Sequence, residues 1–289
     1  MKFQKTLTIL ILIIVVLAVF AAIIGIFSEG GPGEFEMTSV RGEIVLIYGE
    51  GIYKHMSSEV AIQGIAQDWV TLLVAVPLLL LSLSLSRRGS VKARFMLSGT
   101  LLYFLLTYLF YLVMAMYNQL FLVYIILLAA SFFSFVLSIL SYDWNLGKSN
   151  FRNQLSVKLI GGFLIFNAIL MGGMWLSLII PSLLNGKYPE ALDHYTTLPV
   201  QGLDLALFLP LSFLSGLFVI QKKPIGYIGS AIYLVFLSLI MIALLSKILF
   251  MIFVNGADGI PAIIIIPVIN LVTIILAVYT IKNVKEENR

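Results

Sequence analysis

Cysteine is absent from this chain, and charged residues are few. Without cysteine the protein forms no disulfide, no thiolate metal site, no cysteine nucleophile and no haem attachment through cysteine. Charged residues make up 11% of the 289 residues, whereas soluble domains carry about 25%. Hydrophobic residues make up 61%. This composition is typical of a protein that lies in a lipid bilayer. The net charge of +4 does not indicate that the protein binds nucleic acid.

The chain also lacks the local motifs of common enzyme classes. It contains no phosphate-binding loop, no nucleophile elbow and no Rossmann fingerprint. Its only two histidines, His55 and His194, show no metal-ligand spacing. We therefore expect no metal, no cofactor and no catalytic residue that the sequence can identify.

Long apolar runs are what the chain does have. Each is long enough to cross a hydrocarbon layer of about 30 Å at about 1.5 Å per helical residue. The first run exceeds the 7–15 apolar residues of a typical signal peptide, so we predict an uncleaved helix. The eight predicted spans lie at about 6–27, 69–86, 95–116, 120–141, 159–180, 202–220, 225–254 and 260–281.

Charge predicts the orientation of these spans. With the N-terminus inside, 14 of the 18 lysines and arginines fall in inner segments, and 11 of the 14 acidic residues fall outside. Basic residues in short loops favour the cytoplasmic side. We therefore predict a multi-pass protein of the cell membrane with both termini in the cytoplasm. The acidic outer face would gather cations.

Two polar stretches, at about 28–67 and 182–201, form the larger extracytoplasmic loops in this topology. The first contains two short β-prone runs, Ile44–Tyr48 and Ile52–His55, around Gly49-Glu50-Gly51. Such a pattern is typical of a β-hairpin. Pro77 lies near the middle of the second predicted span and predicts a kink there, and Pro210 lies inside the sixth span.

Landmarks recur at a nearly constant distance along the chain. Asp68 and Asp204 each open a span, and the basic pairs that start at Arg87 and Lys222 each close one. The offsets between matching landmarks are all close to half the chain. Each half contains four predicted spans, an even number, so both halves would enter the membrane in the same sense. We predict an all-α bundle of eight helices built from two parallel four-helix repeats, at about 6–141 and 159–281; convergence is the alternative.

Three charged residues in or beside the spans are the strongest candidates for a site. Asp68 and Asp204 lie at helix starts, where the helix dipole favours a carboxylate in any case. Lys247 lies inside a predicted span, where it either snorkels to the interface or pairs with one of the aspartates. We hypothesise that the three line one ligand site between the halves, on the outer side.

Four further polar residues are predicted on the outer side. His55 and His194 are candidates for ligand or proton binding, although a surface role is the simpler interpretation. Asn118 and Asn255 occupy the outer turns before the last span of each half. All four are included in the candidate ligand site.

Three stretches resemble a known set of proteins: Asp68 to Ser90, Tyr117 to Leu122, and His194 to Asp204. They are similar to a set of bacterial polytopic membrane proteins that have no assigned activity. The resemblance implies an eight-helix membrane fold and brings no function with it. Haem A synthases share a four-plus-four parallel arrangement, but they place histidine ligands within their spans, and no predicted span here contains histidine.

Three functional classes follow from these features. The first is a protein that binds or translocates a small ligand or cation at the outer site. The second is a non-catalytic scaffold or sensor whose outer loop contacts a membrane protein partner. The third is a membrane enzyme with an extracytoplasmic site. The paired aspartates and the lysine within a span favour the first class.

Overall fold

The protein is mostly helical. The computed structural model describes residues 3–255 and 262–286. The helices are α1 Gln4–Phe27, α2 Ser58–Val70, α3 Val76–Arg87, α4 Val91–Val113, α5 Phe121–Leu140, α6 Val157–Leu184, α7 Pro199–Leu203, α8 Leu209–Ile220, α9 Pro224–Asn255 and α10 Ala262–Lys282. Two π-helical turns, Thr71–Ala75 and Asp204–Phe208, join α2 to α3 and α7 to α8 without a break.

The described residues contain seven helices that are long and apolar enough to cross a membrane. Helices fit such an environment because they satisfy every backbone polar group internally. The seven spans are α1, α2 with α3, α4, α5, α6, α7 with α8, and α9. The eighth predicted span falls on α10, of which Ile266–Lys282 is described as a shorter apolar helix. The chain is thus a multi-pass membrane protein, and the eighth crossing stays a prediction.

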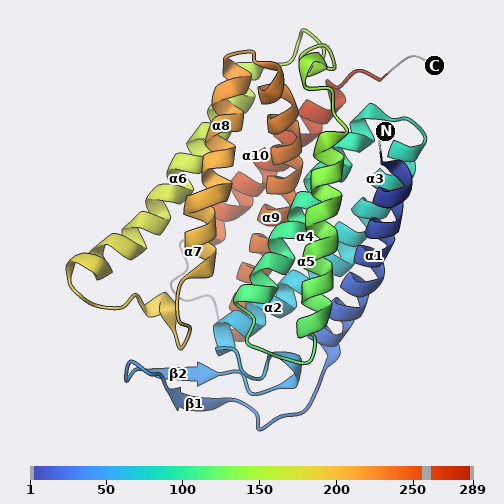
Figure 1. Ribbon diagram of the computed structural model, residues 1–289. Coiled ribbons are helices and arrows are strands. Elements are labelled where there is room, and N and C mark those ends of the chain that lie inside the picture. Colours follow the sequence, from blue (N-terminus) through green and yellow to red (C-terminus); the bar gives the residue numbers. More distant parts are fainter. Residues whose placement is uncertain (1–2, 256–261, 287–289) are drawn as a thin grey trace.

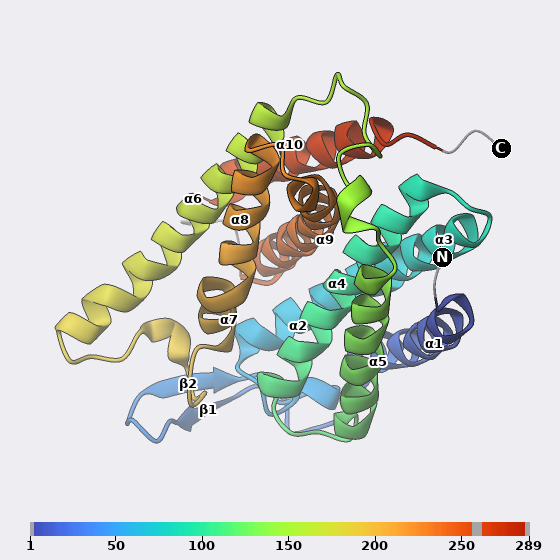
Figure 2. The same ribbon diagram turned by 45° about the horizontal axis from the view of Figure 1, so that its top comes forward.

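The helices form a bundle with distinct ends. Figure 1 shows the N-terminal and C-terminal ends of the chain at one end of the bundle and a two-stranded sheet at the other. We call these the terminal end and the hairpin end. In both views α6 lies at one edge of the bundle beside α8, while α1 lies at the opposite edge near α5 (Figure 2).

Proline explains both π-helical turns. Pro77 and Pro210 each occupy the second position of the helix that follows the turn. Proline has no N–H to donate to the preceding turn, so the backbone there is rearranged. In each turn the N–H after the segment donates to the first residue of the segment, Val76 to Thr71 and Leu209 to Asp204. The kink predicted at Pro77 is therefore a local π turn inside a continuous span, and Pro210 follows a second π turn of the same kind.

The loop between α1 and α2 contains a hairpin, but one strand differs from the prediction. Strands β1 Phe35–Thr38 and β2 Ile44–Ile47 pair antiparallel, with Phe35 opposite Ile47. The predicted strand Ile52–His55 is wrong, because Gly51–Tyr53 forms a short 3-10 turn. Both Gly49 and Gly51 have positive φ, which lets the backbone turn sharply after β2. The backbone N–H of Ile52 donates to the hydroxyl of Ser28 and holds this turn against the end of α1. The chain then meets β2 at a single bridge between Ile47 and Ser57.

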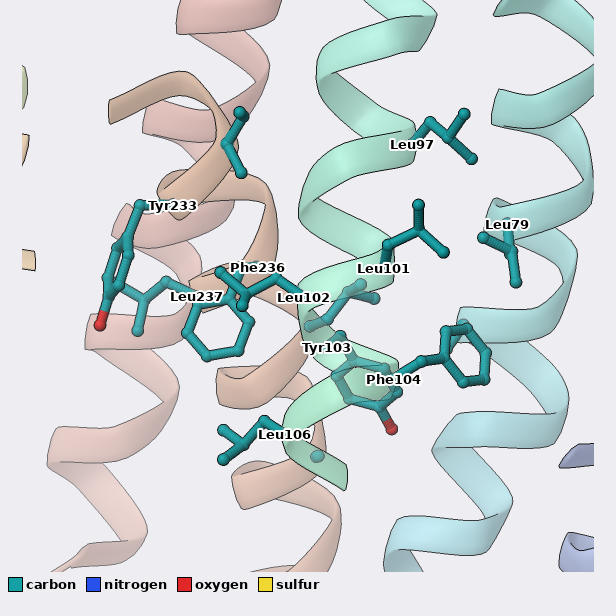
Figure 3. Packing of buried hydrophobic residues seen from close by; sticks show 14 of the residues in the cluster. Leu79, Leu97, Leu101, Leu102, Tyr103, Phe104, Leu106, Tyr233, Phe236 and Leu237 are labelled. Atoms are coloured by element: carbon teal, nitrogen blue, oxygen red, sulfur yellow. The ribbon is translucent and has the colours of Figure 1, made fainter. Parts of the chain in front are cut away.

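Helix α4 runs through the middle of the packed core. Its buried side chains point to both neighbours (Figure 3). Leu102 lies on the side of Phe236 from α9, while Phe104 lies on the side of Leu79 from α3. All four side chains have at most 5% of their surface exposed. This burial fixes the middle of α4 between α3 and α9.

Candidate functional site

A buried carboxylate is the centre of the site. Asp68 lies in α2 and is 4% exposed. The hydroxyl of Tyr53 donates to its Oδ2 at 2.6 Å, and the hydroxyl of Tyr111 donates to its Oδ1 at 2.7 Å. A buried polar group needs hydrogen-bond partners, and each carboxyl oxygen of Asp68 has one in these hydroxyls. Asp68 is therefore an anchored group within the protein rather than an exposed helix cap.

Separate parts of the chain build this contact. Tyr53 comes from the 3-10 turn after the hairpin, Asp68 from α2 and Tyr111 from the last turns of α4. Helix α1 closes the site, because a Cβ placed on Gly25 would overlap Asp68 Oδ2. Burial raises the pKa of Tyr53 well above its usual value, and the nearby Asp68 carboxylate raises it further. The Tyr53 hydroxyl thus keeps its proton and remains a donor.

A second polar cluster lies one turn away and joins α2 to α4. The side-chain amide of Gln67 donates to the hydroxyl of Tyr103 at 2.7 Å and to Thr107 Oγ1 at 3.2 Å. Thr71 and Tyr103 share a further hydrogen bond at 3.0 Å. All four side chains are buried. A connected polar cluster of this kind specifies one register between two apolar helices.

A cavity of about 80 Å³ opens beside the two tyrosines of the carboxylate site. Residues from both halves of the chain line it, including Lys247 from α9 and Val200 from α7. The neighbouring Ser246 hydroxyl donates to the carbonyl of Ala66, which ties α9 to α2 at this level. The other lining residues are Tyr53, Met56, Val60, Gln63, Gly64, Gln67, Thr107, Phe110, Tyr111, Met114 and Ala115.

Lys247 has no close partner in the described part of the chain. Its amine takes part in no hydrogen bond or ion pair with a described residue, yet it keeps some accessible surface. Asp204 is near enough for an electrostatic interaction. The expected ion pair between Lys247 and an aspartate is therefore not formed with a described residue, although Asp204 lies nearby. The amine borders the cavity without a described counter-ion in contact.

Asp204 lies apart from Asp68. Its Oδ2 accepts a hydrogen bond from Trp175 Nε1 at 2.9 Å, so the side chain is held by α6 at the edge of the bundle. Neither aspartate is among the described residues that line the cavity. The hypothesis that both carboxylates share one site with Lys247 finds no support in this geometry. Asp68, in the first half of the chain, is anchored in the core, whereas Asp204, in the second half, is anchored to α6.

The two histidines meet at the hairpin end, but they form no metal site. The Nε2 atom of His194 lies 3.0 Å from the backbone carbonyl of His55, and its ring packs on Tyr195. Within residues 3–255 and 262–286 no group of three histidine, aspartate or glutamate side chains is arranged to hold a metal ion. Both histidines lie outside the described lining of the Lys247 cavity. They belong instead to a contact between the loop that contains the hairpin and the loop between α6 and α7.

That contact joins the hairpin to the loop after α6. Arg41 Nη2 donates to the carbonyls of Asp193 and Tyr195 at 2.7 and 2.8 Å. The Ser57 hydroxyl donates to Asp193 Oδ2 at 2.7 Å. Burial raises the pKa of Tyr195 to about 12, so its hydroxyl stays neutral beside Ser57. These bonds hold the first loop over α2 and keep Tyr53 in place above Asp68.

The two candidate asparagines have different outcomes. Asn118 Oδ1 accepts the N–H of Leu120, and its amide donates to the carbonyl of Met116, so the side chain shapes the turn before α5. Asn118 also lines a separate surface cavity of about 540 Å³ with His55. Asn255 is the last residue of α9, and its side chain lies outside the described part of the chain.

Sequence reasoning missed the residues that complete the site. Tyr53 lies in a segment that we predicted to be a strand, and Tyr111 is one of many tyrosines near span ends. Trp175 resembles an ordinary interfacial aromatic residue. No spacing links these residues to their aspartates, because the contacts join segments 15, 43 and 29 residues apart. The adjacent pair Gln67-Asp68, two polar residues at the start of an apolar run, is the only available signal.

No family model matches the chain, and no curated protein and no solved structure matches it either.

Proposed function

We propose that this membrane protein binds a small ligand or ion in the cavity that Lys247 lines. Binding there is also the first step that translocation would require. The cavity lies toward the hairpin end, because its residues come from the start of α2, the end of α4 and the loop after the hairpin. The observation that carries the proposal is the Lys247 amine, which borders this cavity without a hydrogen bond or ion pair to a described residue.

The energetics of a lone amine support this assignment. Charged side chains within membrane spans are costly and usually face a partner or a water-filled space. Asp68 forms no hydrogen bond or ion pair with Lys247, and its two oxygens accept the hydroxyls of Tyr53 and Tyr111 instead. Asp204 is held by Trp175. A ligand that enters the cavity would supply the contacts that the described protein groups leave unmade.

The internal repeat is part of the same proposal. Each half contains a span with a π turn, and in each the proline lies at the second position of the next helix. Aligned on these turns, Asp204 matches Thr71, and Asp68 matches Gln201. The two aspartates are thus offset by about one helical turn relative to the π turns. We propose a duplicated four-helix unit whose halves have diverged at the site, with Lys247 present in the second half alone.

The cavity can be tested because the chain has no cysteine of its own. We expect Val60→Cys, whose side chain lines the cavity, to react with the small neutral reagent methyl methanethiosulfonate in purified protein. The matched control is Ala61→Cys, since Ala61 is 0% exposed and is not a described lining residue. Mass spectrometry measures the rate, which we expect to be at least tenfold higher at residue 60. Equal reaction rates at the two positions would show that residue 60 does not line an accessible cavity, and would overturn the proposed function.

We also propose that the hairpin end faces out and that both termini lie in the cytoplasm. Val40, in the hairpin turn, is 94% exposed, and Lys148 is exposed near the terminal end. In intact cells, Val40→Cys is expected to react with a membrane-impermeant maleimide, whereas Lys148→Cys is expected to react only after the membrane is permeabilised. The reverse pattern would contradict the orientation that the basic residues predict.

A further inference from the structure

The charge of the Lys247 cavity is positive. Lys247 is the only charged side chain among the described residues that line it. The cation expected from the acidic outer loops therefore does not fit this cavity. A buried or partly buried ammonium group without a counter-ion favours an anion in contact with it.

The nearby carboxylates do not neutralise the cavity by contact. Asp68 is separated from it by the tyrosines that donate to both of its oxygens. Asp204 interacts with Lys247 only through space and is bonded to Trp175 on α6. An anion that enters the cavity therefore reaches the amine without displacing an ion pair of a described residue.

The size of the cavity limits the anion. A dry cavity of about 150 Å³ holds benzene, which has six carbon atoms. A cavity of about 80 Å³ is roughly half of that and suits an anion of about three to five non-hydrogen atoms. Drug-sized ligands usually need about 300 Å³ or more, so they are excluded.

The walls of the cavity define the rest of the ligand. Gln63 offers a side-chain amide on the α2 wall, whereas the amide of Gln67 already donates to Tyr103 and Thr107. Met56, Val60 and Phe110 are apolar. A purely inorganic anion would leave the apolar wall without a contact. An anion with a short apolar tail satisfies both the amine and this wall.

We propose that the site binds a short-chain monocarboxylate anion, of about the size of acetate or propionate, with its carboxylate on Lys247 and its tail against the α2 and α4 walls. This inference rests on the proposed function, because it names the ligand class of the same cavity. An acid of this size contains one negative charge, two acceptor oxygens for the amine, and one or two apolar carbons.

Protection of a cysteine in the cavity tests the ligand class. The reaction of Val60→Cys with methyl methanethiosulfonate is followed in purified protein with sodium propionate, with the neutral isostere propionamide, with ethylammonium chloride and with sodium chloride. We expect propionate at tens of millimolar to slow the reaction at least fivefold, and the other three to change it less than twofold. Lys247→Met, which keeps the length of the side chain, is expected to remove the protection.

Each alternative result has a distinct meaning. A cysteine that does not react at all overturns the cavity and the proposed function together. A reactive cysteine that propionate and propionamide protect equally, or that neither protects, overturns the carboxylate class and leaves a cavity with another ligand. Equal protection by propionate and chloride assigns the site to an inorganic anion and overturns the tail contact. The comparison of propionate with propionamide stays decisive even if Lys247→Met does not fold.

Discussion

Replacing Asp68 by leucine is expected to destabilise the protein by about 3 to 5 kcal/mol. The substitution leaves the hydroxyls of Tyr53 and Tyr111 without their acceptor in a buried position. Each unsatisfied buried donor costs about 1 to 3 kcal/mol. The free energy of unfolding, measured by titration with sodium dodecyl sulfate in mixed micelles, gives the loss.

A compensating set of substitutions separates the hydrogen-bond network from other causes. In the Asp68→Leu background, Tyr53→Phe together with Tyr111→Phe removes the stranded hydroxyls. Replacing every partner of a buried polar contact by apolar groups can be nearly neutral, so we expect most of the lost stability to return. A cost below about 1 kcal/mol for Asp68→Leu alone would show that the carboxylate is not satisfied in the way described.

Gly25→Ala is expected to destabilise the protein by about 2 kcal/mol or more, although alanine normally favours a helix over glycine by about 1 kcal/mol. A Cβ at this position would overlap Asp68 Oδ2 and lie 2.7 Å from the Tyr53 hydroxyl. Helix α1 must then move away from α2, or the carboxylate must leave its tyrosines. Unfolding in mixed micelles measures the change.

Gly173→Ala is the matched control for this prediction. Gly173 also lies in a helix, α6, but a Cβ there would meet no atom within 4 Å. Alanine is therefore expected to be neutral or slightly stabilising at residue 173. If both substitutions had the same sign and size, the close approach of α1 to the carboxylate would not determine stability.

The two predictions describe one structural unit at the hairpin end. Asp68 is held by a tyrosine from the loop that contains the hairpin and a tyrosine from α4, and α1 closes over the group through Gly25. The contacts of Arg41 with the loop between α6 and α7 hold the hairpin loop in place. The Lys247 cavity adjoins this unit through both tyrosines, so the buried carboxylate gives the cavity rigid walls.

The spans and their prolines were predictable from local features. Seven of the predicted spans correspond to helices that are long and apolar enough to cross a membrane, because length and hydropathy are properties of a contiguous segment. Pro77 marked a break in the helical hydrogen bonds, although not the π turn that resolves it. The strand Ile44–Ile47 was predicted to pair with the segment that follows it, Ile52–His55, but it pairs with the segment that precedes it, Phe35–Thr38. Both partners were plausible because glycines with positive φ lie before and after the strand and permit a turn on either side.

The candidate site was predictable from local features only in part. Asp68 and Lys247 were identified as candidates because a charge in an apolar run is rare. Their environments were not predictable. Asp68 accepts hydrogen bonds from the hydroxyls of Tyr53 and Tyr111. Asp204 accepts one from the indole N–H of Trp175. The resemblance between the two halves suggested a symmetric pair of carboxylates, whereas the structure buries Asp68 and joins Asp204 to Trp175 of α6 by a hydrogen bond.

The sequence by itself determined that this chain lies in a membrane, because a run of apolar side chains has no favourable place in water whatever its neighbours are. It also marked the few charges that need an explanation. Only the tertiary structure decided which of those charges is satisfied by the protein and which one borders a cavity. The reason is that a hydrogen bond or a cavity depends on side chains from separate helices, and helix packing rather than order along the chain sets their distances.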